Sequence, residues 1–405
     1  MQRHDVALAA EVRQPDGQIT GEHLGPAGRQ RIEHHQNLQE TSLQERYRVG
    51  VGQADNVVPE SFRGRVFTPH SLTQPGRVGT MNPGVEMIAL GYRLKRLLRV
   101  RPMESAPTLL CWWGSIPGGV TVGDLMAVNN LSAALRSRGC DHSILSHPQF
   151  AAEGHLQCRT LPLLTSEVRT LVFVCGPLVG CPRLMALFKL FPNARKLAVG
   201  VSVLRGESTI NSLVSGFVAR DGMNPSFFDL ALDDVRPACP PSPGRSLRVG
   251  LCFRGRQKEY GRANCKAGRA EAVLKRVAAT ITSRPVRIST ELVQNSPSGL
   301  RSQLDEVDLV LTTRLHGSLL TLGHGKPVIA IDQIEGGAKV LPVLQRIHWP
   351  YVLPVEKASE DRVQSMVREM IQRWPVSEIT HSQSLALALS RQAVQEAVRL
   401  VTHAG

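Results

Sequence analysis

The stretch Asp308–Lys339, DLVLTTRLHGSLLTLGHGKPVIAIDQIEGGAK, decides the fold of this 405-residue chain. It opens with a short, largely apolar run, 308–313, which is typical of a fully buried parallel strand. A short helix is predicted over 318–322, and the glycines that follow it end that helix. A second buried strand is predicted over 328–332. A strand, a helix and a strand in so short a span predict an α/β protein with an open parallel sheet.

Arg314, His316, Gly317 and Ser318 lie where the first of these strands gives way to the helix. This turn falls at the carboxyl edge of the sheet, where open α/β folds bind their ligands. The free N–H groups and the partial positive charge of a helix start favour an anion there. A histidine at a helix start is more often a structural hydrogen bonder, but the adjacent arginine and the sheet edge favour function. We therefore expect an anion site built from these residues.

The composition indicates anionic partners. The chain carries a net charge of +14 and has a sequence pI near 9.9. Such a charge suits nucleic acid, an anionic membrane surface or small anionic substrates. The arginines are spread along the chain, aromatic residues make up only 4% of it, and the aromatic interleaving that single-strand binders use is missing. Small anions are therefore favoured, and no nucleic acid is expected.

The eight cysteines are scattered singly, without a CxxC pair. This predicts buried free thiols in a reducing compartment, with neither a disulfide framework nor a metal site. No apolar run reaches the roughly 18 residues of a membrane-spanning helix. The N-terminus has charges where a signal peptide needs an apolar stretch. We therefore expect a cytoplasmic protein, either free or at the inner face of the membrane.

Residues 1–86 differ from the rest of the chain. They are polar, rich in Gln, His, Arg and Gly, and show no sustained helical or strand period. We expect a low-order N-terminal extension there, and a disordered tail, a regulatory arm and a segment that is not translated all remain open. Residues 87–101, MIALGYRLKRLLRVR, predict a short basic amphipathic helix. It would either contact an anionic membrane peripherally or pack on the first domain.

Two α/β domains are predicted beyond this extension. The proline- and serine-rich stretch 236–246, RPACPPSPGRS, is typical of a linker. It separates an N-terminal Rossmann-like domain, 104–235, from a C-terminal one, 247–356, and helices are predicted within 357–405. The fold class is therefore α/β, with two Rossmann-like domains facing a cleft.

Hydrophobic periodicity predicts the further elements of these domains. Strands are predicted at 108–113, 142–146, 171–175, 197–204, 247–253, 286–292 and 351–355, and helices at 124–138, 182–190, 266–282, 298–304, 336–347, 359–374 and 381–403. A capped helix is also predicted to begin at Ser226.

Two further sets of candidate residues lie in the N-terminal domain. A glycine-rich loop, Gly114–Gly123, joins a strand to a helix, an order that suits a phosphate or a sugar hydroxyl approaching the backbone. Gly123 and Asp124 are candidate substrate contacts at the helix start, and a plain capping carboxylate is at least as good an interpretation of Asp124. Arg220 and Asp221 end a strand, where they would either bind and orient an anion or form a structural ion pair.

The segment TTRLHGSLLTLGHGKPVIAIDQIEGGAKV resembles the C-terminal motif of polysaccharide pyruvyl transferases. Supporting fragments follow the order of that family from about Cys111 to Val355: GGVTVGDLMAVNNLSAALRSRG, FVCGPLVG, FPNARKLAVGVSVL and FVARD. The family commonly carries Asn before the Gly-Asp of the first fragment, whereas Thr121 and Val122 stand before Gly123 in this chain.

This resemblance implies a GT-B-like pair of Rossmann-like domains and a transferase of exopolysaccharide biosynthesis. Members of the family move the pyruvyl group of phosphoenolpyruvate onto two hydroxyls of a sugar in a polysaccharide or its precursor, which forms a pyruvate ketal and releases phosphate. The resemblance also implies that Arg220 and Arg314 bind anions and that His316 is catalytic. Phosphoenolpyruvate is then the donor substrate, the acceptor is a sugar, free or lipid-linked, and neither a cofactor nor a metal is expected. Guanidinium forks suit so anionic a donor, and a histidine can deliver a proton near neutral pH.

Several alternatives stay open. Lys339 would add a phosphate contact to the site, although a surface lysine is the simpler interpretation. A nucleotide-sugar glycosyltransferase of GT-B architecture would share the two domains and the phosphate site. A non-enzymatic basic protein would use the charge alone to bind nucleic acid or membrane. The sequence leaves the acceptor sugar and its linkage, the ketal stereochemistry and the oligomeric state undetermined.

Overall fold

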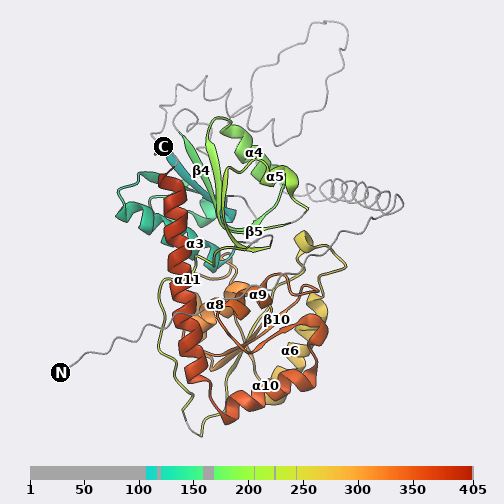
Figure 1. The fold of residues 1–405 in the computed structure, drawn as a ribbon. Coiled ribbons are helices and arrows are strands. Elements are labelled where there is room, and N and C mark those ends of the chain that lie inside the picture. The colour runs from blue at the N-terminus through green and yellow to red at the C-terminus, as the bar shows by residue number, and fades with distance from the viewer. Residues whose placement is uncertain are drawn as a thin grey trace, which may run out of the picture. The chain divides into compact units, whose positions relative to one another are not determined.

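The structure is a computed structural model that describes residues 106–115, 120–157, 168–204, 206–222, 225–242 and 244–403. The extension predicted at 1–86, the amphipathic helix predicted at 87–101 and part of the glycine-rich loop lie outside these residues. The described chain folds into two parallel β-sheets with helices packed against them (Figure 1). The predicted α/β fold class is therefore confirmed.

The first half of the described chain holds a six-stranded parallel sheet of order β3-β2-β1-β4-β5-β6. Its strands are β1 Thr108–Trp112, β2 His142–Ser146, β3 Leu156–Gln157, β4 Thr170–Leu178, β5 Arg195–Val203 and β6 Gly216–Gly222. The helical segments between them are η1 Trp113–Ser115, α3 Val122–Ser137, η2 Pro148–Phe150, α4 Pro182–Leu190 and α5 Ser208–Asn211. The central strands β1 and β4 are buried along almost their whole length, which explains their continuous apolar sequence.

The second half holds a five-stranded parallel sheet of order β11-β10-β9-β7-β8. Its strands are β7 Val249–Cys252, β8 Val286–Arg287, β9 Leu309–Thr312, β10 Val328–Asp332 and β11 Val352–Pro354. Its helical segments are η4 Lys258–Tyr260, α6 Ala267–Ile281, α7 Pro297–Asp305, α8 Leu315–Gly323, α9 Val340–Arg346, η5 Val355–Lys357, α10 Glu360–Gln372 and α11 Val376–Thr402. The strand–helix–strand unit predicted from 308–332 is therefore confirmed as β9, α8 and β10.

The strand predicted over 286–292 is shorter in the structure, where β8 covers only Val286–Arg287. The chain turns after it, because the backbone N–H of Glu291 donates to the Ser289 hydroxyl at 3.2 Å and the side chain of Asn295 donates to the Ser289 carbonyl at 2.8 Å. These local bonds compete with a strand ladder.

The helix predicted from Ser226 is absent, and residues 225–242 run without helix or strand. Phe228 and Leu232 are buried in the core of the second half, whereas Leu230 is buried in the core of the first. Alternate side chains of this segment are thus buried in opposite cores, which a helix would not allow. Tertiary packing therefore overrides the helix-capping signal at Ser226.

The C-terminal helix α11 runs along both halves (Figure 1). Ile379 and Ala386 are buried in the core of the second half, and Ala393 and Ala397 in the core of the first. Gln383 donates to the carbonyl of Leu322 at 2.6 Å. One continuous helix thus connects the two halves through both apolar and polar contacts.

The strand order of each sheet reverses at one place, between β1 and β4 in the first half and between β7 and β9 in the second. Loops that leave the carboxyl ends of such neighbouring strands form the crevice in which open α/β folds bind ligands. Residues from both pairs of loops line one shared cavity.

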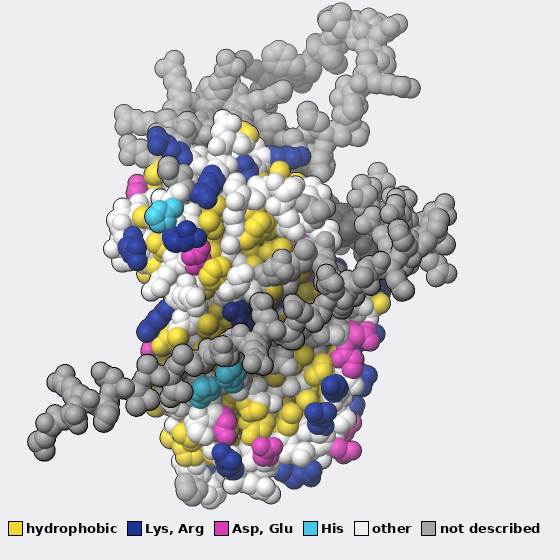
Figure 2. Space-filling model, in the orientation of Figure 1, with side chains coloured by type: hydrophobic (Ala, Val, Ile, Leu, Met, Phe, Trp, Pro, Cys, Tyr) yellow, Lys and Arg dark blue, Asp and Glu magenta, His cyan; other side chains and the backbone are white. Residues whose placement is uncertain are grey.

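Basic residues do not form one patch on the face shown in Figure 2, where Lys and Arg side chains are interspersed with acidic ones. Among the described helices, none has both the length and the apolar character that crossing a bilayer requires.

Candidate active site

The candidate site is a cavity of about 230 Å³ between the two halves. The first half contributes Thr121, Asp124 and Arg220, among others, and the second half contributes Arg254, Arg314, His316 and Lys339. Five of the residues predicted from the sequence to be catalytic or to contact substrate therefore meet in this cavity: Asp124 and Arg220 from the first half, and Arg314, His316 and Lys339 from the second.

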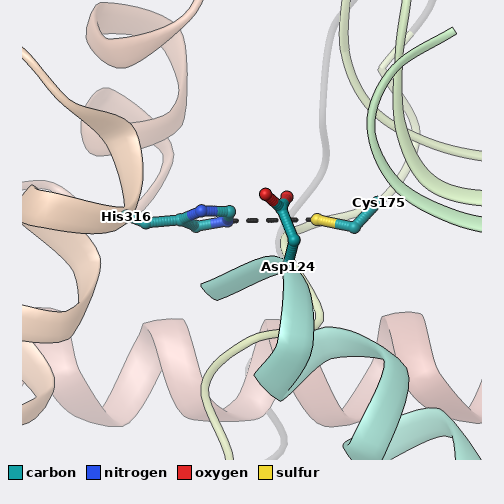
Figure 3. A group of neighbouring side chains, drawn as sticks. All are labelled: Asp124, Cys175 and His316. Carbon is teal, nitrogen blue, oxygen red and sulfur yellow. Dashed lines mark hydrogen bonds between the residues drawn. The ribbon is translucent and has the colours of Figure 1, made fainter. Parts of the chain in front are cut away.

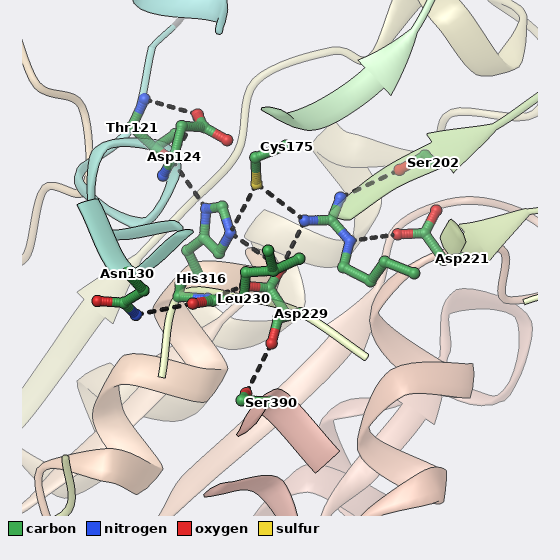
Figure 4. A network of polar contacts seen from close by, with 12 residues as sticks. Thr121, Asp124, Asn130, Cys175, Ser202, Asp221, Asp229, Leu230, His316 and Ser390 are labelled. Atoms are coloured by element: carbon green, nitrogen blue, oxygen red, sulfur yellow. Dashed lines mark hydrogen bonds and ion pairs between the residues drawn. The ribbon is translucent and has the colours of Figure 1, made fainter. Parts of the chain in front are cut away.

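His316, the second residue of α8, reaches across the boundary between the two halves. Its Nδ1 lies 2.8 Å from Oγ1 of Thr121, and its Nε2 lies 3.2 Å from Oδ2 of Asp229 (Figure 4). The Thr121 hydroxyl donates its own proton to Asp124 at 2.7 Å, so Nδ1 must be the donor to Thr121. Nε2 must likewise donate to the Asp229 carboxylate, which only accepts. All these bonds are satisfied together when both ring nitrogens carry a proton.

Asp229 is the buried acidic partner of His316. Its carboxylate accepts from His316 and from NH1 of Arg220 at 2.5 Å, and its second oxygen accepts from the backbone N–H of Ala231 at 2.8 Å. Burial alone would raise the pKa of Asp229, but the positive charges of His316 and Arg220 hold it far below its usual range. Asp229 was missed at the sequence level, where the only signal is an acidic residue inside the apolar run FFDLAL.

Asp124 has the capping role that the sequence allowed. It forms a capping box with Thr121 at the start of α3, accepting from the Thr121 backbone N–H at 2.9 Å. Burial would raise the pKa of Asp124, but the nearby charge of His316 and the bonds from Thr121 lower it below the ordinary value. The carboxylate also lines the cavity, and its contact with an acceptor remains a prediction.

Gly123 has a steric role that differs from the predicted substrate contact. A Cβ added at this position would lie 2.3 Å from Cγ of the His316 ring. The imidazole therefore lies directly against the backbone at the start of α3, where only glycine leaves enough space.

Arg220 and Asp221 form the structural ion pair that was one of the two interpretations of this sequence. Nε of Arg220 donates to Asp221 at 2.7 Å, and NH2 donates to the Ser202 hydroxyl at 3.1 Å. Arg220 is 1% exposed. Its hydrogen bonds go to protein groups, with Asp229 as the third partner, and direct anion binding by Arg220 or Asp221 remains a prediction.

Arg314 precedes α8 and lines the cavity. Its Nε donates to the carbonyl of Phe253 at 2.7 Å and its NH1 to the hydroxyl of Thr290 at 2.6 Å, while NH2 pairs with Glu291. Glu291 also lies 3.7 Å from NH1 of Arg254. An anion that enters this site would therefore compete with the carboxylate of Glu291 for these arginines or share them with it. Glu291 was not among the predicted residues.

Gly317 and Ser318 lie behind the site rather than in its wall. Neither is among the residues that line the cavity. Ser318 donates its hydroxyl to the carbonyl of Arg314 at 2.9 Å, and a Cβ on Gly317 would lie 2.8 Å from Oγ1 of Thr312. Ser318 thus bonds back to the start of its own helix, Gly317 leaves space for Thr312 of β9, and a substrate contact by either residue remains a prediction.

Lys339 is half-buried and lines the cavity, and its contact with a phosphate remains a prediction. Its Nζ lies 5.9 Å from the centre of the Tyr260 ring. Burial and, after it, the charge of Arg220 lower the pKa of Lys339. Arg254 lines the same cavity and was not predicted as a site residue. With Arg314, these two cations make the cavity attractive to a small anion.

Two Rossmann-like halves that open onto one cavity and are joined by a final helix define a GT-B-like α/β protein. Similar solved structures include a Listeria monocytogenes protein assigned as a UDP-N-acetylglucosamine 2-epimerase (10% identity, 73% of this chain and 96% of the other, TM-score 0.42). They also include the Methanocaldococcus jannaschii UDP-GlcNAc 2-epimerase in complex with UDP-GlcNAc and UDP (9% identity, 73% and 99%, TM-score 0.42), and the glycotransferase of kitacinnamycin (11% identity, 75% and 99%, TM-score 0.38). The comparison with curated proteins gives no match.

Residues 263–333 match the family model of polysaccharide pyruvyl transferase. The match confirms, over this stretch, the resemblance seen in the sequence. It includes Glu291, Arg314 and His316, whereas Asp124, Asp229 and Lys339 lie outside it. The match supports a transferase.

Proposed function

We propose that this chain is a pyruvyl transferase that moves the pyruvyl group of phosphoenolpyruvate onto two hydroxyls of a sugar in a polysaccharide or its precursor. One observation carries the proposal: His316, hydrogen-bonded at both ring nitrogens, stands in the wall of a cavity that is also lined by Arg254, Arg314 and Lys339. A proton donor beside a cationic cavity fits a donor substrate that is anionic and must be protonated on carbon.

The cations would hold phosphoenolpyruvate through its phosphate and its carboxylate. Arg314 is fixed by Phe253 and Thr290, so its orientation is set before the substrate arrives. Pre-organised cations stabilise charge that develops on a departing phosphate. Glu291 would give way to, or share Arg314 with, the incoming anion.

His316 would act first as an acid and then as a base. We assign the transferred proton to Nε2, whose hydrogen bond to Asp229 is the longer of the two. Its transfer to the methylene carbon forms a methyl group and leaves an electron-poor carbon that bears the phosphate. A sugar hydroxyl adds to that carbon and returns a proton to the neutral imidazole. The bond from this carbon to the phosphate oxygen then breaks, the second hydroxyl adds in its place to close the ketal, and its proton leaves on the released phosphate.

The acceptor would approach from the first half of the chain, where Asp124 lines the cavity. The acceptor class that we propose is a sugar with two hydroxyls close enough to close a ring, either free or lipid-linked. A cytoplasmic location, with peripheral membrane contact through residues 87–101, belongs to the same proposal.

Incubation of the full chain with phosphoenolpyruvate and a panel of saccharides tests the proposal through phosphate release and mass spectrometry of the acceptor. We expect phosphate release that depends on the acceptor and a pyruvate ketal on the product. Nucleotide sugars in place of phosphoenolpyruvate provide the control. Sugar transfer from a nucleotide, without any pyruvate ketal, would replace this proposal with a glycosyltransferase.

Arg314→Lys is expected to weaken phosphoenolpyruvate binding about 10- to 150-fold, the equivalent of losing one charged hydrogen bond of about 1.5–3 kcal/mol. A lysine cannot bond the Phe253 carbonyl, Thr290 and an anion together as a planar fork does. Thermal-shift titration with phosphoenolpyruvate measures the effect. Arg301→Lys, an exposed change on α7, is the matched control and should bind normally. Equal binding by both variants would contradict the role of Arg314.

Gly123→Ala is expected to lower turnover about 100-fold, because a displacement of the catalytic ring by an ångström can cost that much. The added methyl would collide with the His316 ring. Gly268 is the matched control, since it is also the second residue of a helix and a Cβ there meets nothing within 4 Å. Gly268→Ala should leave turnover unchanged and stabilise the fold by up to about 1 kcal/mol. Normal turnover in Gly123→Ala would show that the ring tolerates displacement.

A further inference from the structure

Three neighbouring side chains have the chemistry of metal ligands: Asp124 and His316, which line the cavity, and Cys175, which is buried beside them. A carboxylate oxygen of Asp124, Sγ of Cys175 and a ring nitrogen of His316 all lie within 4.8 Å of one another (Figure 3). They come from the start of α3, from β4 and from the start of α8. Oxygen, sulfur and imidazole nitrogen together form a donor set that suits Zn²⁺. The sequence predicts no metal site, because these residues come together only in the fold.

The surrounding groups orient these ligands as they do in metal sites. Thr121 binds Nδ1 of His316 and leaves Nε2 to face Sγ of Cys175 at 3.9 Å. A ligating histidine almost always has such a hydrogen bond on its other nitrogen. NH1 of Arg220 lies 3.4 Å from Sγ and would stabilise a thiolate. Oδ2 of Asp229, 3.2 Å from Nε2, offers a fourth ligand.

Acidic side chains surround these ligands. Asp221 and Asp229 both pair with Arg220, and the carboxylate of Asp124 belongs to the ligand group itself. A divalent cation would therefore have anionic partners in the buried cluster, as a buried charge requires.

We propose that Asp124, Cys175 and His316 form a Zn²⁺ site, with Asp229 as the fourth contact, and that its occupation inhibits the transferase. Zn²⁺ takes the electron pair of Nε2, where catalysis requires a proton. Metal binding and proton transfer therefore exclude each other. The inhibition rests on the proposed function, whereas the binding does not.

Cadmium titration of the full chain tests the binding directly, because a Cd²⁺–thiolate bond gives an ultraviolet charge-transfer band. We expect a band that saturates at one equivalent in the wild-type chain, is lost in Cys175→Ser and is retained in Cys239→Ser. Cys239 is exposed and serves as the control for adventitious binding. A band that survives in Cys175→Ser, or no band in the wild-type chain, would overturn the proposal.

Zn²⁺ affinity provides a second measurement that does not depend on the sulfur. His316→Gln keeps the thiol but should weaken Zn²⁺ binding at least about 10- to 100-fold, as measured by competition with a chelating dye. Unchanged affinity in His316→Gln would place the metal elsewhere.

The two proposals fail in different ways. A cadmium band without any pyruvate transfer would leave the metal site and remove the proposed function. Pyruvate transfer that is insensitive to Zn²⁺, in a chain that gives no cadmium band, would leave the function and remove the metal site.

Discussion

Turnover of phosphoenolpyruvate is expected to fall about 100- to 10,000-fold in His316→Gln, the range that a positioned general acid contributes. Glutamine can still bond Thr121 and fill most of the space of the ring, but it cannot donate a proton to carbon at neutral pH. The binding of phosphoenolpyruvate should change far less, because Arg254, Arg314 and Lys339 remain. Steady-state phosphate release and thermal-shift titration, done on the same preparation, separate the two effects.

His324→Gln is the matched control for this change, since His324 ends the same helix. It is a buried histidine that lies 2.8 Å from Asp305 and lines no part of the cavity. Its substitution should affect stability rather than turnover. A folded His316→Gln variant with normal turnover would remove His316 from the mechanism.

The second half of the fold could be predicted closely because its sequence pattern and its packing agree. The run around Leu309–Thr312 is apolar along its whole length, as a strand covered on both faces must be. A helix that begins three residues after the end of this strand places Arg314 and His316 at the sheet edge. Local sequence therefore locates these two residues, and the cavity contains both.

The partners of these residues could not be predicted, because they depend on contacts between the two halves. Ser226 and Asp229 have the S-x-x-D spacing of a capping box, which predicts a helix. In the structure Asp229 instead pairs with Arg220 and His316, and its apolar neighbours are buried on both sides. A helix cap typically contributes about 1 kcal/mol. The ion pair of Asp229 and the burial of its apolar neighbours together outweigh that contribution.

The partners of Arg220 show the same limit of prediction from sequence. The ion pair between Arg220 and Asp221 joins neighbours in the sequence and could be anticipated. The hydrogen bond from Arg220 to Asp229 could not, because the residues around Asp229 show no helical or strand periodicity that would place them. A pattern in the sequence can place an arginine at the end of a strand. Only the fold decides whether its donors face a ligand or a buried carboxylate.

Asp229→Asn is expected to reduce turnover about 100-fold or more while keeping the shape of the site. The carboxylate lies against Nε2 of His316 and pairs with Arg220, and a neutral amide offers no charge to either contact. Breaking a buried ion pair costs about 3–5 kcal/mol when the remaining charge is left uncompensated, and less here because Asp221 still faces Arg220. Phosphate release and urea unfolding measure the two effects, with Asp233→Asn as the control, since Asp233 is exposed on the same segment.

The pH dependence of this stability loss follows from the lowered pKa of Asp229. A carboxylate with a depressed folded pKa adds stability above its unfolded value of about 3.9, and that stability is lost as the pH falls below this value toward the folded pKa. The difference in unfolding free energy between the wild type and Asp229→Asn should therefore shrink as the pH falls below about 4. A difference that grows below this pH would mean that Asp229 is protonated in the folded chain. His316 would then lack its counter-ion, and the acid role proposed for it would lose its physical basis.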